Sequence, residues 1–173
     1  MKFYLLIFYL VFCLTGRSQE EMPLSPSDSV SLSNTWEKLA KAITARNKPQ
    51  LRQLSVPLID CQVCSEIDSN FVRQFVSPDR FFEMIFALTK TTNLATALQS
   101  KDLHVGVTKF VDFQPNHSGL KDGEDFIMYH ASVKVESTST NANQTPHKNE
   151  GAYIFQFVKK SGRFMFYGFD TLP

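Results

Sequence analysis

Several short motifs that are typical of particular enzyme classes are missing from this sequence. It has no glycine-rich phosphate loop, no GxSxG nucleophile elbow and no HExxH zinc motif. Its 18 lysines and arginines nearly balance its 17 acidic residues, so it also lacks the basic footprint of a nucleic-acid binder. We therefore expect no nucleic-acid partner and no cofactor.

The apolar run at the start of the chain is short. Phe3 to Leu14 is about a dozen residues, whereas a membrane-spanning helix needs about 20. Lys2 precedes the run, and Gly16 and Ser18 place small side chains after it, which is the layout of a secretory signal peptide. We predict a signal peptide over 1–18, a secreted or periplasmic protein, and no stable membrane insertion after cleavage.

Cysteine is scarce, and Cys13 belongs to the predicted signal. In an oxidising compartment the remaining pair in IDCQVCSE, Cys61 and Cys64, favours a disulfide. A redox CxxC works at a helix N-terminus, and no strong helix signal follows this pair. A zinc site would need two further ligands, but the histidines are scattered: His104, His117, His130 and His147. We predict a disulfide and no metal, and keep the redox role as a weaker alternative.

The sequence predicts one domain after a tether. Residues 19–31, QEEMPLSPSDSVS, are rich in serine, proline and acidic residues and predict a flexible tether, and residues 32–173 predict a single domain. Helical spacing predicts a first helix from about Ser33 to Arg46, whose apolar positions are Trp36, Leu39, Ala40 and Ile43.

Proline marks the next three elements. Asn47-Lys48-Pro49 breaks the first helix and starts a short one. Pro57 in SVPLIDCQVC suggests a strand at a sheet edge. Ser77 can cap a helix that has Pro78 at its first position, and a weaker helical stretch follows from Asn93 to Gln99.

From His104 the apolar period changes to two. LHVGVTKFVDF and FIMYHASVKV predict two half-buried strands, and the polar segment from Ser137 to Glu150 predicts a long connection. The last pair, YIFQFVKKSGRFMFYGF, predicts a hairpin that turns at Ser161-Gly162. Pairing outward from that turn sets Phe157 against Phe166 on one face and Ile154 against Phe169 on the other.

Both faces of the final hairpin are therefore predicted to be apolar. Helices can cover one face, and the other needs a second cover. A partner subunit is the simplest one, so we expect a homodimer through the outer face of the sheet.

Helices followed by long antiparallel strands make an α+β arrangement in which a curved sheet wraps round its N-terminal helices. With AITARNKPQLRQLS joining the first helices and YIFQFVKKSGRFMFYGF closing the chain, this order resembles the nuclear transport factor 2-like (NTF2-like, cystatin-like) superfamily over residues 32 to 171. The exported members with a CxxC on the first strand are the most similar. The resemblance implies a cone-shaped, mostly antiparallel fold and no particular function, because the superfamily holds enzymes and binding modules alike.

The ketosteroid-isomerase type is the enzyme precedent in this superfamily. It implies a tyrosine on the first helix and a carboxylate base on the first strand, and those positions fall near Leu39 and Val63 here. Both needed groups are missing. Asp60 is a possible displaced base, although a solvated strand aspartate is the more ordinary interpretation.

Three polar-face residues are the candidates for catalysis. His104, His130 and Asp112 could meet across neighbouring strands as an acid-base group. Our first hypothesis is nevertheless an exported noncatalytic module that binds an apolar small molecule or an envelope protein. The alternative is a small isomerase-like or hydrolase-like enzyme. The phenylalanines near the C-terminus either line an apolar pocket or form the core.

Overall fold

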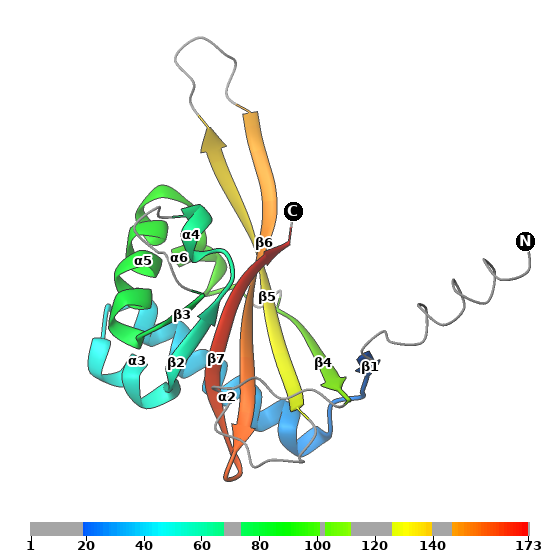
Figure 1. Cartoon of the computed structure of the whole chain (residues 1–173). Coiled ribbons are helices and arrows are strands. Elements are labelled where there is room, and N and C mark those ends of the chain that lie inside the picture. Colours follow the sequence, from blue (N-terminus) through cyan, green and yellow to red (C-terminus); the bar gives the residue numbers. More distant parts are fainter. Residues whose placement is uncertain (1–18, 68–73, 101–102, 112–125, 140–146, 173) are drawn as a thin grey trace, which may run out of the picture.

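The computed structural model describes residues 19–67, 74–100, 103–111, 126–139 and 147–172 (Figure 1). The helices in these ranges are α2 (Pro26–Thr44), α3 (Lys48–Leu54), α4 (Cys64–Ile67), α5 (Pro78–Thr91) and α6 (Leu94–Ala97). The strands are β1 (Gln19–Glu21), β2 (Ser55–Cys61), β3 (Phe75–Val76), β4 (His104–Phe110), β5 (Phe126–Ser139), β6 (His147–Lys160) and β7 (Arg163–Leu172). The predicted signal peptide lies outside the described residues.

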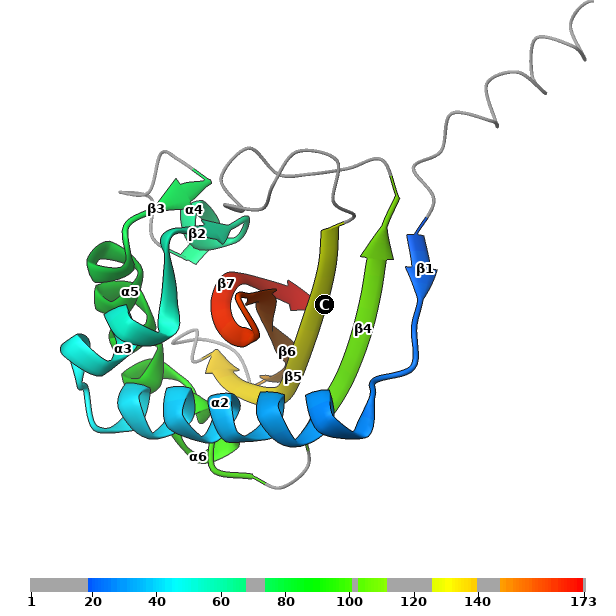
Figure 2. The same ribbon diagram turned by 90° about the horizontal axis from the view of Figure 1, so that it is seen from below.

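Within the described residues the strands form one sheet in the order β1-β4-β5-β6-β7-β2-β3. Neighbouring strands are antiparallel except β2 and β7, which are parallel. Figure 2 shows α2 crossing the molecule from the β1 and β4 side to the side that carries α3, α5, β2 and β3. Helices packed in a curved, mostly antiparallel sheet confirm the predicted α+β class.

The first helix begins well before the predicted position. Ser25 caps α2 by accepting a hydrogen bond from the Asp28 backbone N–H at 3.1 Å, and Pro26 occupies the first helical position. Lys159 of β6 then donates to Asp28 Oδ1 at 2.6 Å, which holds this first turn against the sheet. The expectation of a flexible tether over residues 19–31 is therefore wrong from Pro26 onward.

The start of that segment also has regular structure. Gln19–Glu21 forms β1, which pairs antiparallel with β4 at the edge of the sheet. Backbone hydrogen bonds do not require an apolar side-chain pattern, so the polar composition of this segment concealed the strand.

The helices marked by proline follow the prediction. Asn47 caps α3 by accepting from the Gln50 backbone N–H at 3.1 Å, and Ser77 accepts from the Arg80 backbone N–H at 3.5 Å to cap α5. Arg52 of α3 donates to both carboxylate oxygens of Asp79 in the first turn of α5, at 2.7 and 2.9 Å. The weak helical stretch is confirmed in shorter form as α6.

Strand β2 is not at the sheet edge, which corrects the prediction from Pro57. The two-residue strand β3 pairs with Ile59 and Asp60 on one side of β2, and β7 pairs with it on the other. Pro57 lies between Ser55 and Asp60, where the register with β7 shifts. An irregular stretch tolerates a proline because its missing N–H breaks no regular ladder there.

The predicted long connection between the central strands is also partly strand. β5 and β6 pair as far as Ser139 and His147, so much of the polar segment Ser137 to Glu150 belongs to a long hairpin that extends beyond the helices (Figure 1). Serine, threonine and asparagine side chains do not prevent this pairing, since the ladder is made by backbone groups.

The final hairpin turns as predicted but changes register further out. Ser161 and Gly162 both have positive φ, as a two-residue turn requires, and Phe157 pairs with Phe166. One extra residue in β7 then makes Gln156 pair with Gly168 and Phe155 with Phe169, so the predicted pairing of Ile154 with Phe169 is wrong. This β-bulge turns Phe169 to the helix side of the sheet, where its ring lies 5.1 Å from that of Phe155.

Among the described residues, the buried apolar side chains form two clusters. The larger lies between helices and sheet and includes Trp36, Phe81, Phe155, Phe166 and Phe169. The smaller consists of Val56, Phe126, Val158 and Tyr167, with Phe110, Met128 and Met165 packed against it. The smaller cluster draws on positions that alternate with the helix-facing ones, so it lies on the outer face of the sheet. Part of that face is thus already buried within one chain.

Candidate functional site

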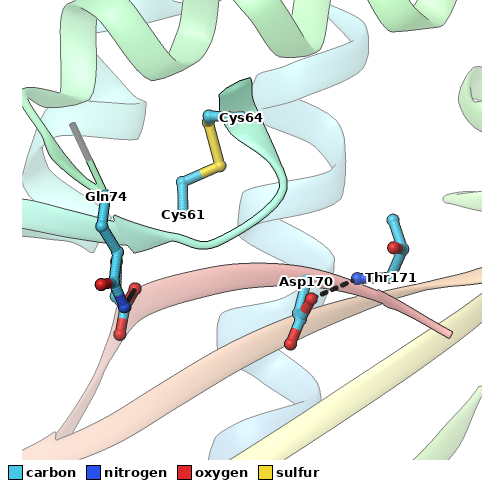
Figure 3. The surroundings of a disulfide bond; sticks show 6 residues. Cys61, Cys64, Gln74, Asp170 and Thr171 are labelled. Carbon is cyan, nitrogen blue, oxygen red and sulfur yellow. Dashed lines mark hydrogen bonds between the residues drawn. A yellow bond between two sulfur atoms is a disulfide. The ribbon is translucent and has the colours of Figure 1, made fainter. Parts of the chain in front are cut away.

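Cys61 and Cys64 form a disulfide between the end of β2 and the start of α4, as predicted. Figure 3 shows it on the helix side of β2, while the side chain of Gln74 extends to the opposite side. Both cysteines are buried in the larger cluster, at 1% and 0% exposure. Thiol–disulfide exchange requires a thiolate to reach a sulfur atom, so this environment favours a structural bridge over a redox centre.

The two described histidine candidates lie on the same face of neighbouring strands. His104 is exposed and pairs with Ser132, while His130 is half-buried and pairs with Gly106. His130 Nε2 lies 3.4 Å from Thr108 Oγ1. Burial lowers the pKa of His130, the Glu21 carboxylate opposes that shift, and His104 adds to it.

No hydrogen bond joins His104 to His130 within the described part of the chain, and the third candidate, Asp112, lies outside the described residues. The same part contains no group of three or more histidine, cysteine or acidic side chains placed to hold a metal ion. The catalytic hypothesis for these residues therefore remains a prediction, and the described geometry adds no acid-base pair to it.

The two positions that the resemblance to the ketosteroid-isomerase type assigned to working groups are apolar and buried in this structure. Leu39 and Val63 both lie in the larger buried cluster. The Phe155 ring contacts that of Trp36 at 5.1 Å, and the Phe81 ring contacts that of Phe169 at 5.5 Å. These phenylalanines fill the core, as the simpler of the two interpretations predicted.

The outer face of the sheet instead carries a row of polar residues in register across five strands. Gly106 of β4 pairs with His130 of β5, which pairs with Gln156 of β6, which pairs with Gly168 of β7, which pairs with Asp60 of β2. We call these five residues the polar row. It runs at right angles to the strands and offers imidazole, amide and carboxylate groups for hydrogen bonding.

The two glycines of the polar row let its side chains lie flat on the sheet. A Cβ at Gly106 would stand 2.7 Å from His130 Cδ2, and a Cβ at Gly168 would stand 2.3 Å from Gln156 Oε1. His130 thus leans over β4 and Gln156 leans over β7, so the two side chains extend away from each other.

Asp60, the last member of the polar row, faces away from the helices. Its Oδ1 accepts a hydrogen bond from Gln74 Nε2 at 2.9 Å. Burial raises the pKa of Asp60, the bond from Gln74 opposes that shift, and the nearby charge of Asp170 adds to it. As a strand aspartate Asp60 is more enclosed than the sequence suggested.

Tyr167 lies in the bulge of β7, beside Gly168. It is 2% exposed, and its buried hydroxyl has no hydrogen-bond partner among the residues that the structure describes. Burial raises the pKa of Tyr167, and the charge of Asp60 raises it further, so the phenol and the carboxylate interact electrostatically. Local sequence patterns do not reveal this relationship, because it depends on the bulge.

A separate cavity lies on the helix side. It has a volume of about 610 Å³ and is lined by Ser33, Glu37, Ala40, Lys41 and Thr44 of α2 and by Leu98, Gln99, Ser100 and Leu103. Its walls mix charged, polar and apolar side chains without a grouping that indicates one chemistry. In the described part of the chain, no helix is long and apolar enough to cross a bilayer.

No protein-family profile matches this chain, and no curated protein is similar to it in sequence. Several solved structures resemble it distantly, among them the following three. The Kfla4162 protein from Kribbella flavida is 12% identical with a TM-score of 0.45, and the match covers 84% of this chain and 90% of that one. An NTF-2 like protein of unknown function from Shewanella oneidensis MR-1 is 9% identical with a TM-score of 0.36, covering 85% and 98%.

The third structure is a putative calcium/calmodulin dependent protein kinase II association domain from Xanthomonas campestris. It is 16% identical with a TM-score of 0.40, and the match covers 88% of this chain and 92% of that one. At such identities and TM-scores the likeness is distant and tells nothing about ligands or activity.

Proposed function

We propose that this chain is an exported, noncatalytic NTF2-like module that works by binding, and that its partner is another protein of the cell envelope. The main support is the packing of the cone interior, where phenylalanine side chains bury one another. An apolar small molecule would compete with these side chains for the same space. The exposed polar groups of the outer face are better suited to a polar contact.

The leader-like sequence at 1–18 supports export, and so does the disulfide, since such bonds persist in oxidising compartments. Mass spectrometry of the protein recovered from an exporting host tests this part of the proposal. The mass should correspond to a chain that begins at Gln19 and is two hydrogens lighter than the reduced form. A full-length chain with free thiols would contradict it.

Binding through the outer face can be tested with a photo-crosslinking amino acid. Lys134 is exposed on β5, close to the polar row, whereas Lys38 is exposed on α2. A crosslinker at position 134 should give one discrete adduct in the native envelope, and the same group at position 38 should give none. Equal labelling at both positions would contradict a partner on the outer face.

A homodimer through the outer face is a second form of the same proposal. An apolar outer face supports a dimer less strongly than expected, because Val158 and Tyr167 on that face are already buried within one chain. Light scattering coupled to size exclusion gives the test, and an adduct of twice the chain mass at position 134 would support the dimer. A monomer at high micromolar concentration, with an adduct of another mass, leaves the envelope protein as the partner.

A further inference from the structure

The β2 end of the polar row has more hydrogen-bond acceptors than donors. Asp60 Oδ1 accepts from Gln74 Nε2 at 2.9 Å, and Asp170 Oδ1 accepts from the Thr171 backbone N–H at 2.8 Å (Figure 3). Within the described part of the chain, the other oxygen of each carboxylate has no hydrogen-bond partner. Unused carboxylate oxygens favour a ligand that donates hydrogen bonds.

These two carboxylates also lack a cation of their own. The ion pairs of the described residues join other groups: Lys48 with Glu83, Arg52 with Asp79, Arg80 with Glu83, and Lys159 with Asp28. Asp60 and Asp170 lie on the same face of adjacent strands, close enough for Asp170 to raise the pKa of Asp60. A positive charge between them would relieve this repulsion.

The orphaned hydroxyl of Tyr167 is an independent sign of a missing ligand. Leaving a buried polar group unpaired costs about 1–3 kcal/mol, and such groups in native structures call for an explanation. This hydroxyl belongs to Tyr167, the residue next to Gly168, and the negative charge of Asp60 raises the pKa of its phenol. Because this hydroxyl is fully buried in the unliganded chain, a molecule bound at the carboxylates would become its partner only if the Tyr167 side chain moved toward the surface.

Gly168, which pairs with Asp60 and precedes Asp170 by two residues in β7, leaves the sheet surface beside the two carboxylates without a side chain. Gln156 Oε1 lies over this glycine, in the space that a Cβ would occupy, and so adds an amide oxygen beside the carboxylates. The resulting surface presents three side-chain oxygen acceptors from three adjacent strands.

We infer that Asp60, Asp170, Gln156 and Tyr167 form a binding site for an organic cation, a guanidinium or primary ammonium group. This inference rests on the proposed binding function and deepens it by naming the site and the chemistry recognised. Guanidinium fits better than ammonium, because its planar fork of N–H donors reaches acceptors that stand apart. A bare metal ion fits less well, since the described residues contain no cluster of three ligating side chains.

The test uses n-butylguanidinium as the probe, titrated into the isotope-labelled, disulfide-bonded protein at constant ionic strength and followed by amide NMR. Saturable shifts should appear at Asp60, Gly168 and Asp170 and in the side-chain amide of Gln156. n-Butylammonium should bind the same residues more weakly. Shifts that never saturate, or that sodium chloride reproduces, would overturn the inference.

Matched variants separate the site from general acidity. Asp60→Asn should weaken binding by about tenfold or more, because it removes the charge but keeps the shape. Tyr167→Phe should weaken it less, and Glu37→Gln on the exposed side of α2 should leave it unchanged. Equal affinity in the wild type and Asp60→Asn would sink the proposal, provided the variant's amide spectrum shows an intact fold.

The pH dependence gives a further check. The groups that face Asp60 are Gln74, which directly precedes β3, and Tyr167 and Asp170 from β7, and the phenol stays neutral below pH 10 because its pKa is raised. Binding should therefore strengthen as the pH rises through the pKa of Asp60 and then level off. Affinity that stays constant between pH 3 and 7 would contradict a charged Asp60 as the recognising group.

The crosslink at position 134 shows where the cation comes from. If n-butylguanidinium competes with the adduct, the cation is a side chain of the partner protein. If the probe binds but the adduct survives, the site takes a free small molecule. An adduct without any probe binding would overturn the cation site and leave the proposed binding function intact.

Discussion

Gln156 pairs with Gly168 across β6 and β7, and its Oε1 occupies the space where a side chain at position 168 would begin. The backbone oxygen of Asp60 closes the same space from the other side, 3.0 Å from the position of that Cβ. A glycine is therefore required at 168 by packing and not by an unusual φ angle.

Gly168→Ala should destabilise the protein by about 1–3 kcal/mol, since the new methyl meets a backbone atom as well as a movable side chain. Gly106→Ala is the matched comparison, because its nearest neighbours are atoms of the His130 ring, which can swing away. Urea unfolding of both variants measures the difference. A larger loss at position 106 would show that the glycines have been ranked wrongly.

Tyr167→Phe should stabilise the protein by about 1–2 kcal/mol, because it removes a buried hydroxyl that has no hydrogen-bond partner and keeps the ring contact with Phe126. Tyr153→Phe serves as the control, since the half-buried Tyr153 is not an orphan of this kind. Thermal unfolding in the absence of any ligand is the measurement. A loss of stability in Tyr167→Phe would mean that the hydroxyl is bonded in solution.

Asp60→Asn should raise stability at neutral pH by less than about 1 kcal/mol, after allowing for solvent screening at a half-buried group. Burial raises the folded-state pKa of Asp60 above its unfolded value, so the charged form costs stability above the folded pKa. The gain should shrink as the pH falls and disappear below about pH 4, where the wild-type carboxyl is protonated in both states. Chemical unfolding at several pH values checks the sign, and a gain that grows toward low pH would reverse it.

The disulfide is expected to be structural. Replacing Cys61 and Cys64 together with alanine should cost about 1–3 kcal/mol, a modest value because the ring it closes is very short. Alanine suits the test better than serine, since both positions are buried among apolar side chains. The amide spectrum should keep its fold pattern, and a thiol titration of the native wild type should find no free thiol.

Ser25→Ala should destabilise the start of α2 by about 1 kcal/mol, because the Asp28 backbone N–H loses its acceptor. Ser29→Ala, on the exposed side of the same helix, should be neutral or slightly stabilising, since alanine favours a helix interior. Hydrogen exchange over Asp28 to Leu32 reports this locally. Identical exchange in the wild type and Ser25→Ala would restore the view of this segment as a tether.

The comparison of these two caps shows what the sequence could reveal. Ser77-Pro78 predicts a helix start because a clear apolar face follows it. Ser25-Pro26 has the same serine cap and first-turn proline, but the residues that follow it are polar. Capping chemistry is local and can be read from the sequence. At Ser25 the polar composition of the residues that follow conceals the cap.

The candidate site depended on information that local patterns do not hold. The hairpin turn at Ser161-Gly162 fixed the pairing out to Phe157 and Phe166, but the bulge beyond them decides that Gly168 meets Gln156. A β-bulge cannot be read from the alternating apolar pattern, because it inserts one residue that this alternation does not count. Asp60 and Tyr167 therefore come together only in the folded sheet, although each was visible as a residue.

The parallel contact between β2 and β7 sets an order of events for folding. Ser55 of β2 pairs with Phe166 of β7, so β2 can complete its hydrogen-bond ladder only after β7, the last strand of the chain, has formed. Pairings between residues so distant in sequence slow folding, because the loop must close before the contact is made. While the last strand is still missing, the segment from Ser55 to Cys61 lacks its main neighbour, so β2 completes its hydrogen-bond ladder late in folding.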